Sequence, residues 1–461
     1  MREPLTRRDL LARAALTAVA ASGAGELVDR YATSPVRAAA GRRGQEQHLL
    51  LDARIVHDDG IAVVVPPLHH RIVTAKVNVP PSRLRAAQRR LERALAALEA
   101  DYEPTARGLG VTVAWGLPYF LRFVPRAWAA RGPLDVRAGK SSLLPARRFP
   151  SDRRDVLLED NDVAILLRSD GLEHVTDGAA RIARALDPIA DVTSVRTGFA
   201  GGGFDGRRSL PKRMALAAGI PGAEHIPDTA ELFLGFTSTQ RSALGPSRIA
   251  NVETLGYTRR NTYFRGGTHM HLSHVYEDLE RWYRAYSFDE RVQVAFGADR
   301  RVAPGTQTVK QARHDAYDPA LIVRQYRHTG VLGHSSGLQT ASRLERDVRG
   351  PDGTLYERGT AIPQRGDFNT LDNPFAWSSR PSRDRMRPGH AAGVHFVAFH
   401  PTSDDFHRVR LAMDGALPDG TKLPFEPHDK AQGFNSVLRT THRQNFIVPP
   451  RAHRSFPLAE L

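Results

Sequence analysis

The sequence has 461 residues, of which 41% are hydrophobic and 25% are charged. This is the composition of a globular protein long enough for two hydrophobic cores, and it excludes an intrinsically disordered chain. The absence of cysteine excludes disulfides, iron–sulfur clusters and thiolate catalysis. The net charge of +15 comes from basic residues scattered among acidic ones, without a compact basic motif. We therefore expect no nucleic-acid partner, and we expect an anionic cell-envelope surface as a possible contact.

The N-terminus has the layout of an export signal. Residues 6–11 (TRRDLL) resemble a twin-arginine motif, an apolar stretch covers residues 10–21, and residues 38–40 (AAA) form a small-residue cleavage site. Residues 1–40 are therefore predicted to be a twin-arginine signal peptide, and the protein is predicted to be exported, folded, to the cell envelope or beyond. No later run is long and apolar enough to predict a membrane span.

The first half of the mature chain alternates between strand and helix patterns. A hairpin is expected around Asp58-Asp59-Gly60. The helix at residues 82–102 has apolar residues every three or four positions, and Ser82 can cap it. The predicted order is strand 72–79, helix 82–102, strand 110–116, strand 163–168, helix 174–186 and strand 191–198, with residues 118–160 as loop. Strand–helix–strand–strand–helix–strand is the ferredoxin-like arrangement.

The second half repeats this pattern less regularly. Strands are predicted at residues 231–237, 268–275 and 393–400, and helices after residue 278 and at residues 402–413. Residues 298–392 are expected to be loop, and residues 414–461 show little periodicity. A loop region of that length is usually functional. The sequence thus predicts an α+β fold with two ferredoxin-like domains built on antiparallel sheets, at residues 41–215 and 216–461.

A glycine-rich turn follows the last strand of the first domain. Residues 199–208 read FAGGGFDGRR, and Asp205 is the one carboxylate among the glycines. Glycine lets the backbone take positive φ and approach another group closely. An acid on such a turn can carry a proton in catalysis, although Asp-Gly is also the commonest tight-turn dipeptide.

Residues 202–206 (GGFDG) resemble the GxxDG motif of dye-decolorising peroxidases, a family of haem peroxidases. Other segments are similar to that family in the same order: residues 111–116, 162–168, 231–236, 266–269, 278–282, 289–292 and 393–399. The resemblance implies two ferredoxin-like domains of the dimeric α+β barrel type, with haem b in the second. It also implies reduction of hydrogen peroxide, oxidation of a bulky organic donor, and a homo-oligomer.

The resemblance also implies roles for particular residues. Asp205 and Arg365 match the catalytic acid and the distal arginine, and Gly203, Phe204 and Gly206 would contact the cofactor. His334 would be the axial ligand of the haem iron, with His314, His328 and His390 as rival candidates. A neutral imidazole can bind iron, a carboxylate can move a peroxide proton, and an arginine can stabilise the developing negative charge. The residues after the motif, Arg207-Arg208-Ser209, depart from the family's pattern.

Alternative interpretations stay open at this point. Residues 333–337 (GHSSG) match the G-x-S-x-G nucleophile motif of α/β-hydrolases, with Ser335 as the nucleophile. His269 and His271 alternate on a predicted strand with His274 nearby, which could form a metal site. The protein could also be an exported ferredoxin-like protein that has lost haem and acts as a non-enzymatic binding or haem-handling protein.

Overall fold

The computed structural model describes residues 44–51, 54–58, 61–201, 208–236, 248–259, 262–307, 318–373, 389–424, 426 and 429–461. The predicted export signal lies outside these residues, so it stays a prediction. The expected hairpin is present as β1 (Ile55–Asp58) paired antiparallel with β2 (Ile61–Val64). Within the described residues, no helix combines the length and the apolar character needed to cross a membrane.

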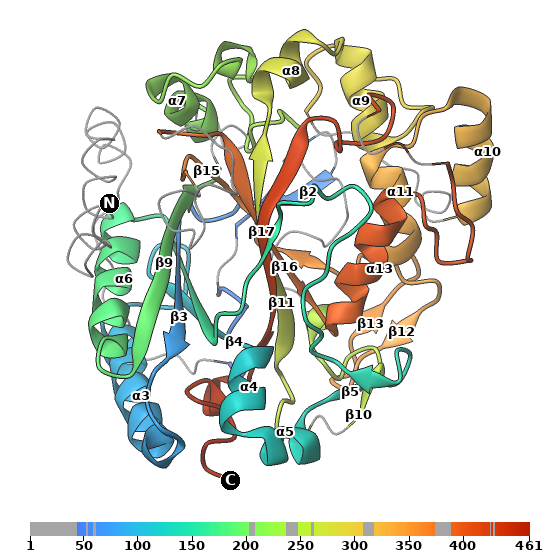
Figure 1. Cartoon of the computed structure of the whole chain (residues 1–461). Coiled ribbons are helices and arrows are strands. Elements are labelled where there is room, and N and C mark those ends of the chain that lie inside the picture. The colour runs from blue at the N-terminus through green and yellow to red at the C-terminus, as the bar shows by residue number, and fades with distance from the viewer. Residues whose placement is uncertain are drawn as a thin grey trace.

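The N-terminal half of the fold is a four-stranded antiparallel sheet with helices on its outer face (Figure 1). Along the chain it contains β3 (His69–Val77), α3 (Leu84–Asp101), β4 (Gly110–Gly116), β8 (Val163–Ser169), α6 (Leu172–Leu186) and β9 (Ala190–Phe199). The strands lie side by side in the order β9-β3-β8-β4. The predicted ferredoxin-like order is therefore confirmed for this half.

Helix α3 shows why the sequence pattern gave a reliable prediction. Its leucines at positions 84, 91, 95 and 98 are all buried against the sheet, as the three-to-four-residue spacing requires. The predicted cap was wrong, because Ser82 lies in a short 3₁₀ turn, η1 (Pro81–Arg83), and the residue before α3 is Arg83, whose side chain makes no capping bond.

The C-terminal half has the same strand order. Its elements are β11 (Thr268–Glu277), α8 (Leu279–Arg284), α9 (Phe288–Phe296), β15 (Phe368–Thr370), β16 (Gly393–His400), α13 (Ser403–Met413) and β17 (Leu438–Val448). These strands lie in the order β17-β11-β16-β15, all antiparallel. Numbered within each half, both sheets therefore have the order 4-1-3-2, which is the ferredoxin-like one.

The two sheets join at both edges into a closed barrel. β4 pairs with β17, where Trp115 lies opposite Ile447, and β9 pairs with β15, where Phe199 lies opposite Asn369. The interior of the barrel is filled by a shared apolar core that includes Ile72, Leu166, Met270, Leu272, Phe368, Phe399 and Phe446. Closure removes exposed sheet edges, and the predicted α+β fold class is confirmed. The division at residue 215 falls inside α7 (Leu210–Ala217) and stays a prediction.

Several segments differ from the sequence-based expectation. Residues 118–160 contain most of α4 (Leu117–Phe123) and α5 (Pro125–Arg131), and residues 298–392 contain α10 (Pro319–Thr329) and α11 (His334–Ser342). The predicted strand at 231–237 was wrong over its described residues, because residues 231–235 form turns and the backbone N–H of Phe233 donates to a side chain, Asn369 Oδ1, at 2.9 Å.

The remaining elements are short. They are β5 (Leu134–Asp135), β6 (Lys140–Ser141), β7 (Leu157–Leu158), β10 (Thr258–Arg259), β12 (Val348–Arg349), β13 (Leu355–Tyr356), β14 (Gln364–Arg365), η2 (Ala223–His225), η3 (Arg248–Ala250) and η5 (Arg451–His453). Of these, β14 matters most here, because it pairs with β16 at the edge of the C-terminal sheet and places Arg365 opposite Ala398.

Candidate active site

A pocket lies between the outer face of the C-terminal sheet and the helices α9, α11 and α13. Because strand residues alternate between faces, alternate residues in the second half of β11 face this pocket, namely Ser273, Val275 and Glu277. Other apolar lining residues include Leu234, Phe296, Leu338, Val394, Phe396, Phe406 and Phe434. The walls are thus mainly apolar, with polar groups at a few positions, as in most cofactor sites.

His334 enters the pocket from the first residue of α11. The preceding glycine is needed there, since a Cβ at Gly333 would lie 2.5 Å from the backbone nitrogen of Gly297 at the end of α9. The imidazole packs against the ring of Phe434, with centroids 4.5 Å apart, and forms no hydrogen bond with any described residue. Burial, followed by the charges of Arg365 and Arg410, lowers the pKa of His334 to about 3. The ring is therefore neutral at physiological pH and can offer a nitrogen to a metal ion.

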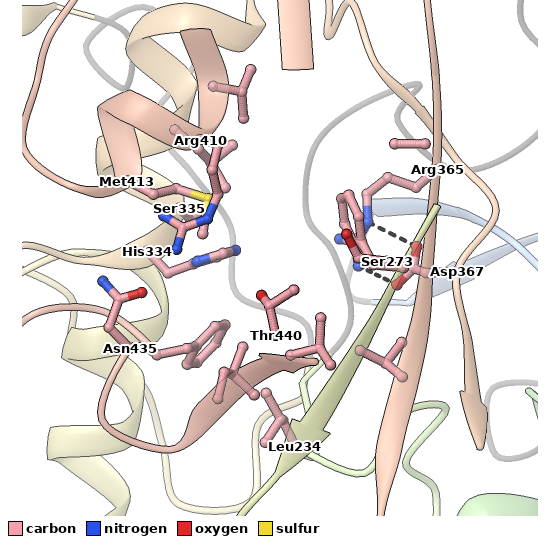
Figure 2. A pocket seen from close by; sticks show the side chains of 18 of the residues that line it. Leu234, Ser273, His334, Ser335, Arg365, Asp367, Arg410, Met413, Asn435 and Thr440 are labelled. Atoms are coloured by element: carbon pink, nitrogen blue, oxygen red, sulfur yellow. Dashed lines mark hydrogen bonds and ion pairs between the residues drawn. The ribbon is translucent and has the colours of Figure 1, made fainter. Parts of the chain in front are cut away.

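Arg365 reaches into the same pocket from the opposite wall (Figure 2). Its guanidinium forms a two-point ion pair with Asp367, with Nε–Oδ1 and Nη2–Oδ2 distances of 3.0 and 2.5 Å. Asp367 is buried and the Arg365 side chain is 22% exposed, so the carboxylate anchors an arginine that is still partly accessible. The structure thus brings His334 and Arg365 together across one pocket.

Two further arginines line the pocket, Arg410 from helix α13 and Arg443 from strand β17, and each has an acidic partner. Arg443 is bound by Asp152, at 2.5 and 2.8 Å, and Arg410 is bound by Asp414 and Ser151. These cations sit at the pocket wall together with Asp152 and Ser151, which line it. They can attract the carboxylate groups of a ligand without being isolated buried charges.

The sequence analysis missed Arg410 and Arg443, and it also missed two further titratable residues of the pocket, Glu277 and His400. Glu277 is 5% exposed, and burial, followed by the charge of Asp367, raises the pKa of its carboxyl to about 8. His400 is also buried; neither ring nitrogen has a hydrogen-bond partner in the described part of the chain, and burial lowers its pKa to about 3. The alternation of the two predicted strands could have placed both on the pocket face, but only once the outer face was known to be hollow.

The glycine-rich motif cannot be placed. Gly203, Phe204, Asp205 and Gly206, as well as His314, lie outside the described residues. The last residue of β9 is described, and the carbonyl of Phe199 accepts a bond from Asn369 Nδ2 at 3.2 Å. The chain therefore enters the motif from a strand that pairs with β15, next to the segment that carries Asp367.

The two rival histidines that the structure describes, His328 and His390, lie away from the pocket. His328 is exposed on α10 and His390 is exposed just before β16, and neither lines the pocket. Of the candidates whose positions the structure describes, His334 is the one that faces Arg365. The assignment of an axial ligand is still a prediction.

The hydrolase interpretation was wrong. Ser335 lies on α11, its hydroxyl accepts a bond from Gln339 Nε2 at 2.9 Å, and the segment before it ends a helix rather than a strand. The nucleophile motif of α/β-hydrolases requires a parallel sheet, whereas the strands beside this pocket are antiparallel.

The metal-site interpretation was also wrong for the residues that can be checked. His271 has both ring nitrogens occupied, by Asn445 at 2.7 Å and Ser273 at 2.6 Å, and His269 bonds Ser142 at 2.9 Å. His274 points to the barrel interior, on the other face of β11, where it lies near His395. Over the described ranges, no group of three or more His, Asp or Glu side chains is arranged to hold a metal ion.

Comparison with solved structures identifies the class of fold. The DyP-type peroxidase from Cellulomonas bogoriensis is 18% identical over 91% of this chain and 96% of its own, with a TM-score of 0.54. The encapsulated DyP-type peroxidase from Mycobacterium smegmatis is 14% identical over 85% and 96%, and a variant of DypB from Rhodococcus jostii in complex with heme is 13% identical over 85% and 96%; both have TM-scores of 0.51. The chain has the fold of DyP-type peroxidases, as the sequence resemblance implied.

At the level of sequence, the chain belongs to DUF7405, a family of unknown function whose profile matches residues 67–450. No curated protein matches the chain. The fold and the family are thus established.

Proposed function

We propose that the protein binds haem b in the pocket of the C-terminal half through His334, reduces hydrogen peroxide and oxidises a bulky organic donor. The observation that carries this proposal is the position of His334 and Arg365 on opposite walls of one mainly apolar pocket. Solved structures with the same fold include a peroxidase variant in complex with heme, which adds support from the fold alone.

The donors of the pocket fit a haem group. His334 offers a neutral imidazole that makes no hydrogen bond to the described residues, and the aromatic and aliphatic walls suit a flat apolar macrocycle. Arg410 and Arg443 lie where the carboxylates of such a cofactor could bind. When bound, the haem would supply the redox chemistry of peroxide reduction.

The remaining roles belong to the chain itself. His334 would hold the cofactor from the helix side, and Arg365 would stabilise negative charge on the opposite side. Asp205, together with Gly203, Phe204 and Gly206, would approach from the turn after β9, with Asp205 moving a peroxide proton. Export by the twin-arginine route, contact with an anionic envelope surface and homo-oligomer formation belong to the proposal on sequence grounds.

The first test is the absorption spectrum of protein made with ample haem. We expect a Soret band in the wild type and its loss or displacement in His334→Ala. His328→Ala is the matched control, because it removes an exposed imidazole from the neighbouring helix α10 and should leave the band unchanged. No Soret band in the wild type would end the proposal, and a band unchanged by His334→Ala would move the ligand elsewhere.

The ion pair of Arg365 favours a second candidate function. Asp367 already occupies two of the guanidinium's donors, so the positive charge available to a peroxide is reduced. A protein that holds haem without reacting with peroxide, as a haem-handling protein would, fits this feature. The discriminating result is a wild-type Soret band that peroxide does not change and that supports no oxidation of a dye.

A further inference from the structure

We propose that Glu277 is a second proton-donating residue of the pocket, whose neutral carboxyl gives a hydrogen bond, and then its proton, to an oxygen-bearing ligand bound there. The identity of that ligand, hydrogen peroxide, rests on the proposed function. The burial of the carboxyl, its position in the pocket lining and its oxygen without a partner among the described residues rest on the structure alone.

The register of the sheet places Glu277 on the pocket face among apolar residues. It follows Ser273 and Val275 at alternate positions of β11, and all three line the pocket. Val275 lies opposite Val394, and Glu277 lies opposite Leu438, both of which also line it. The carboxyl therefore has hydrocarbon on its two neighbouring strands and the pocket in front of it.

Glu277 lacks the arginine partner that five other acids of the chain have. Glu159 is paired with Arg196, Asp152 with Arg443, Asp162 with Arg122, Asp405 with Arg137 and Asp367 with Arg365. Glu277 forms no ion pair with any residue that the structure describes, and its buried Oε2 has no hydrogen-bond partner among them. An isolated buried carboxylate is costly, so the protonated form of this group is favoured.

The groups around the carboxyl agree with a neutral state. Asp367, on the segment between β14 and β15, is an acid, and its nearby charge favours keeping the proton on Glu277. Tyr283, on α8, also interacts with Glu277, and its hydroxyl donates to the carbonyl of Phe233 at 2.6 Å. Among the described residues, two cations line the pocket from the sheet, and both are bound by acids, Arg365 by Asp367 and Arg443 by Asp152. A carboxylic acid kept neutral in this way can donate a hydrogen bond at physiological pH.

Reduction of one hydrogen peroxide to two waters consumes two protons and two electrons, and the electrons come from the organic donor. As the O–O bond breaks, the O–H bond of Glu277 breaks and a new O–H bond forms on the departing oxygen, which leaves as water. The carboxylate then regains its proton from solvent. Glu277 thus supplies one of the two protons and is unchanged after each cycle.

The first experiment uses haem-free protein, so it does not depend on the proposed function. Infrared spectra recorded as the pH is raised should show the carbonyl band of a protonated carboxyl at pH 7, and this band should fade through about pH 8. The band should be absent in Glu277→Gln and present in Glu280→Gln, which removes a half-exposed carboxyl three residues away. A missing wild-type band, or one that Glu277→Gln leaves intact, overturns the proposal.

The second experiment measures the reaction of haem-loaded protein with hydrogen peroxide. We expect the wild-type rate to fall above about pH 8, and Glu277→Gln to be slower by ~10²–10⁴ with that pH dependence removed. A Soret band with peroxide kinetics and a pH profile unaffected by Glu277→Gln refutes the donor role and leaves the proposed function standing. A missing Soret band refutes the proposed function, while the infrared result still decides the state of Glu277.

Discussion

The two halves of the barrel have the same strand order, but their outer faces differ: one is closed by packed helices and the other lines a pocket. On β3 of the N-terminal half, the outward positions are Val73, Ala75 and Val77, and helices α3 and α6 close over them as one apolar core. On β11, the corresponding first strand of the C-terminal half, the outward positions are Ser273, Val275 and Glu277, and they line a pocket. The helices of this half, α9, α11 and α13, leave a cavity above the sheet.

The same contrast holds on the third strand of each half. β8 presents Val163, Ile165 and Leu167 to the helices, all of them fully buried. β16 presents Phe396, Ala398 and His400 to the pocket. The outer face of the N-terminal sheet is thus packed by apolar side chains, whereas that of the C-terminal sheet carries polar groups that line a cavity. This is the expected difference between a scaffold and a functional site built on the same fold.

The largest expected effect concerns the segment that links the two halves. Asp205 follows β9 of the N-terminal half, yet it is proposed to act in the pocket of the C-terminal half. Asp205→Asn should leave the Soret band in place and slow the reaction with peroxide by ~10²–10⁴, because a proton carrier is lost. Stopped-flow spectra of the haem-loaded variant measure this rate. An unchanged rate would show that the turn is structural.

Arg365 provides the next test of the pocket wall. Arg365→Ala should slow the same reaction by ~10²–10³, since it removes a preorganised positive charge. Asp367→Asn should act in the opposite direction, because it frees the guanidinium that the carboxylate now occupies. If both variants react like the wild type, the ion pair is only structural, and the haem-handling function becomes the better account.

Acid should destabilise the C-terminal half through its buried histidines. The pKa of His400 is lowered by burial to about 3, while an unfolded histidine titrates near 6.5. Between these values the unfolded chain binds more protons, so the free energy of unfolding falls as the pH drops below 6.5, by about 2 kcal/mol at pH 5 for this residue. His400→Leu should remove about that much of the loss between pH 7 and pH 5.

Urea denaturation of the haem-free protein, followed by tryptophan fluorescence, measures this effect. Between pH 5 and pH 6, the free energy of unfolding should change less steeply with pH in the variant, by the equivalent of about one bound proton. An equal acid sensitivity in wild type and variant would mean that His400 is hydrated or hydrogen-bonded, contrary to its burial here.

The smallest expected effect is the difference between the same substitution on β3 and on β11, the first strand of each half. Val73→Ala opens a cavity in a closed core and should cost about 2 kcal/mol of unfolding free energy. Val275→Ala faces the pocket and should cost less than about 1 kcal/mol, because little packing is lost. The midpoints of urea denaturation measure both. Equal losses of unfolding free energy in the two variants would mean that protein side chains fill the pocket in solution. The two outer faces would then not differ.

The sequence predicted those elements whose local pattern matches their burial. The strands at 110–116 and 393–400 were predicted with their observed bounds, and α3 was recognised from its buried leucines. In each case one face packs on apolar residues, so the spacing of apolar residues in the sequence indicates whether the segment is a helix or a strand. The order of these elements was enough to obtain the ferredoxin-like fold.

The missed elements owe their burial to partners far away in the sequence. β17 reads LRTTHRQNFIV and was not predicted, because its buried polar residues are satisfied by distant segments; Arg443, for example, is bound by Asp152, and Gln444 bonds Asn161. Helix α11 was hidden for a related reason. Its residues are small and polar, and they are buried by packing against α13.

The candidate site divides in the same way. His334 and Arg365 could be proposed from their order in the sequence, and the structure places both in one pocket. Glu277 and His400 could not, since a charged residue at a strand end usually faces solvent. Both residues line a cavity above the sheet. A local sequence pattern cannot predict that cavity, because it depends on how far the helices lie from the sheet.

The most direct test of the account is the resonance Raman spectrum of the ferrous, haem-loaded protein. We predict an iron–imidazole stretching band in the wild type, its loss in His334→Gly, and its return when free imidazole is added to that variant. Because the added imidazole restores only a ligand, such rescue would place the iron next to the space left by His334. A wild-type band that persists in His334→Gly without added imidazole would contradict the claim that this pocket holds the haem.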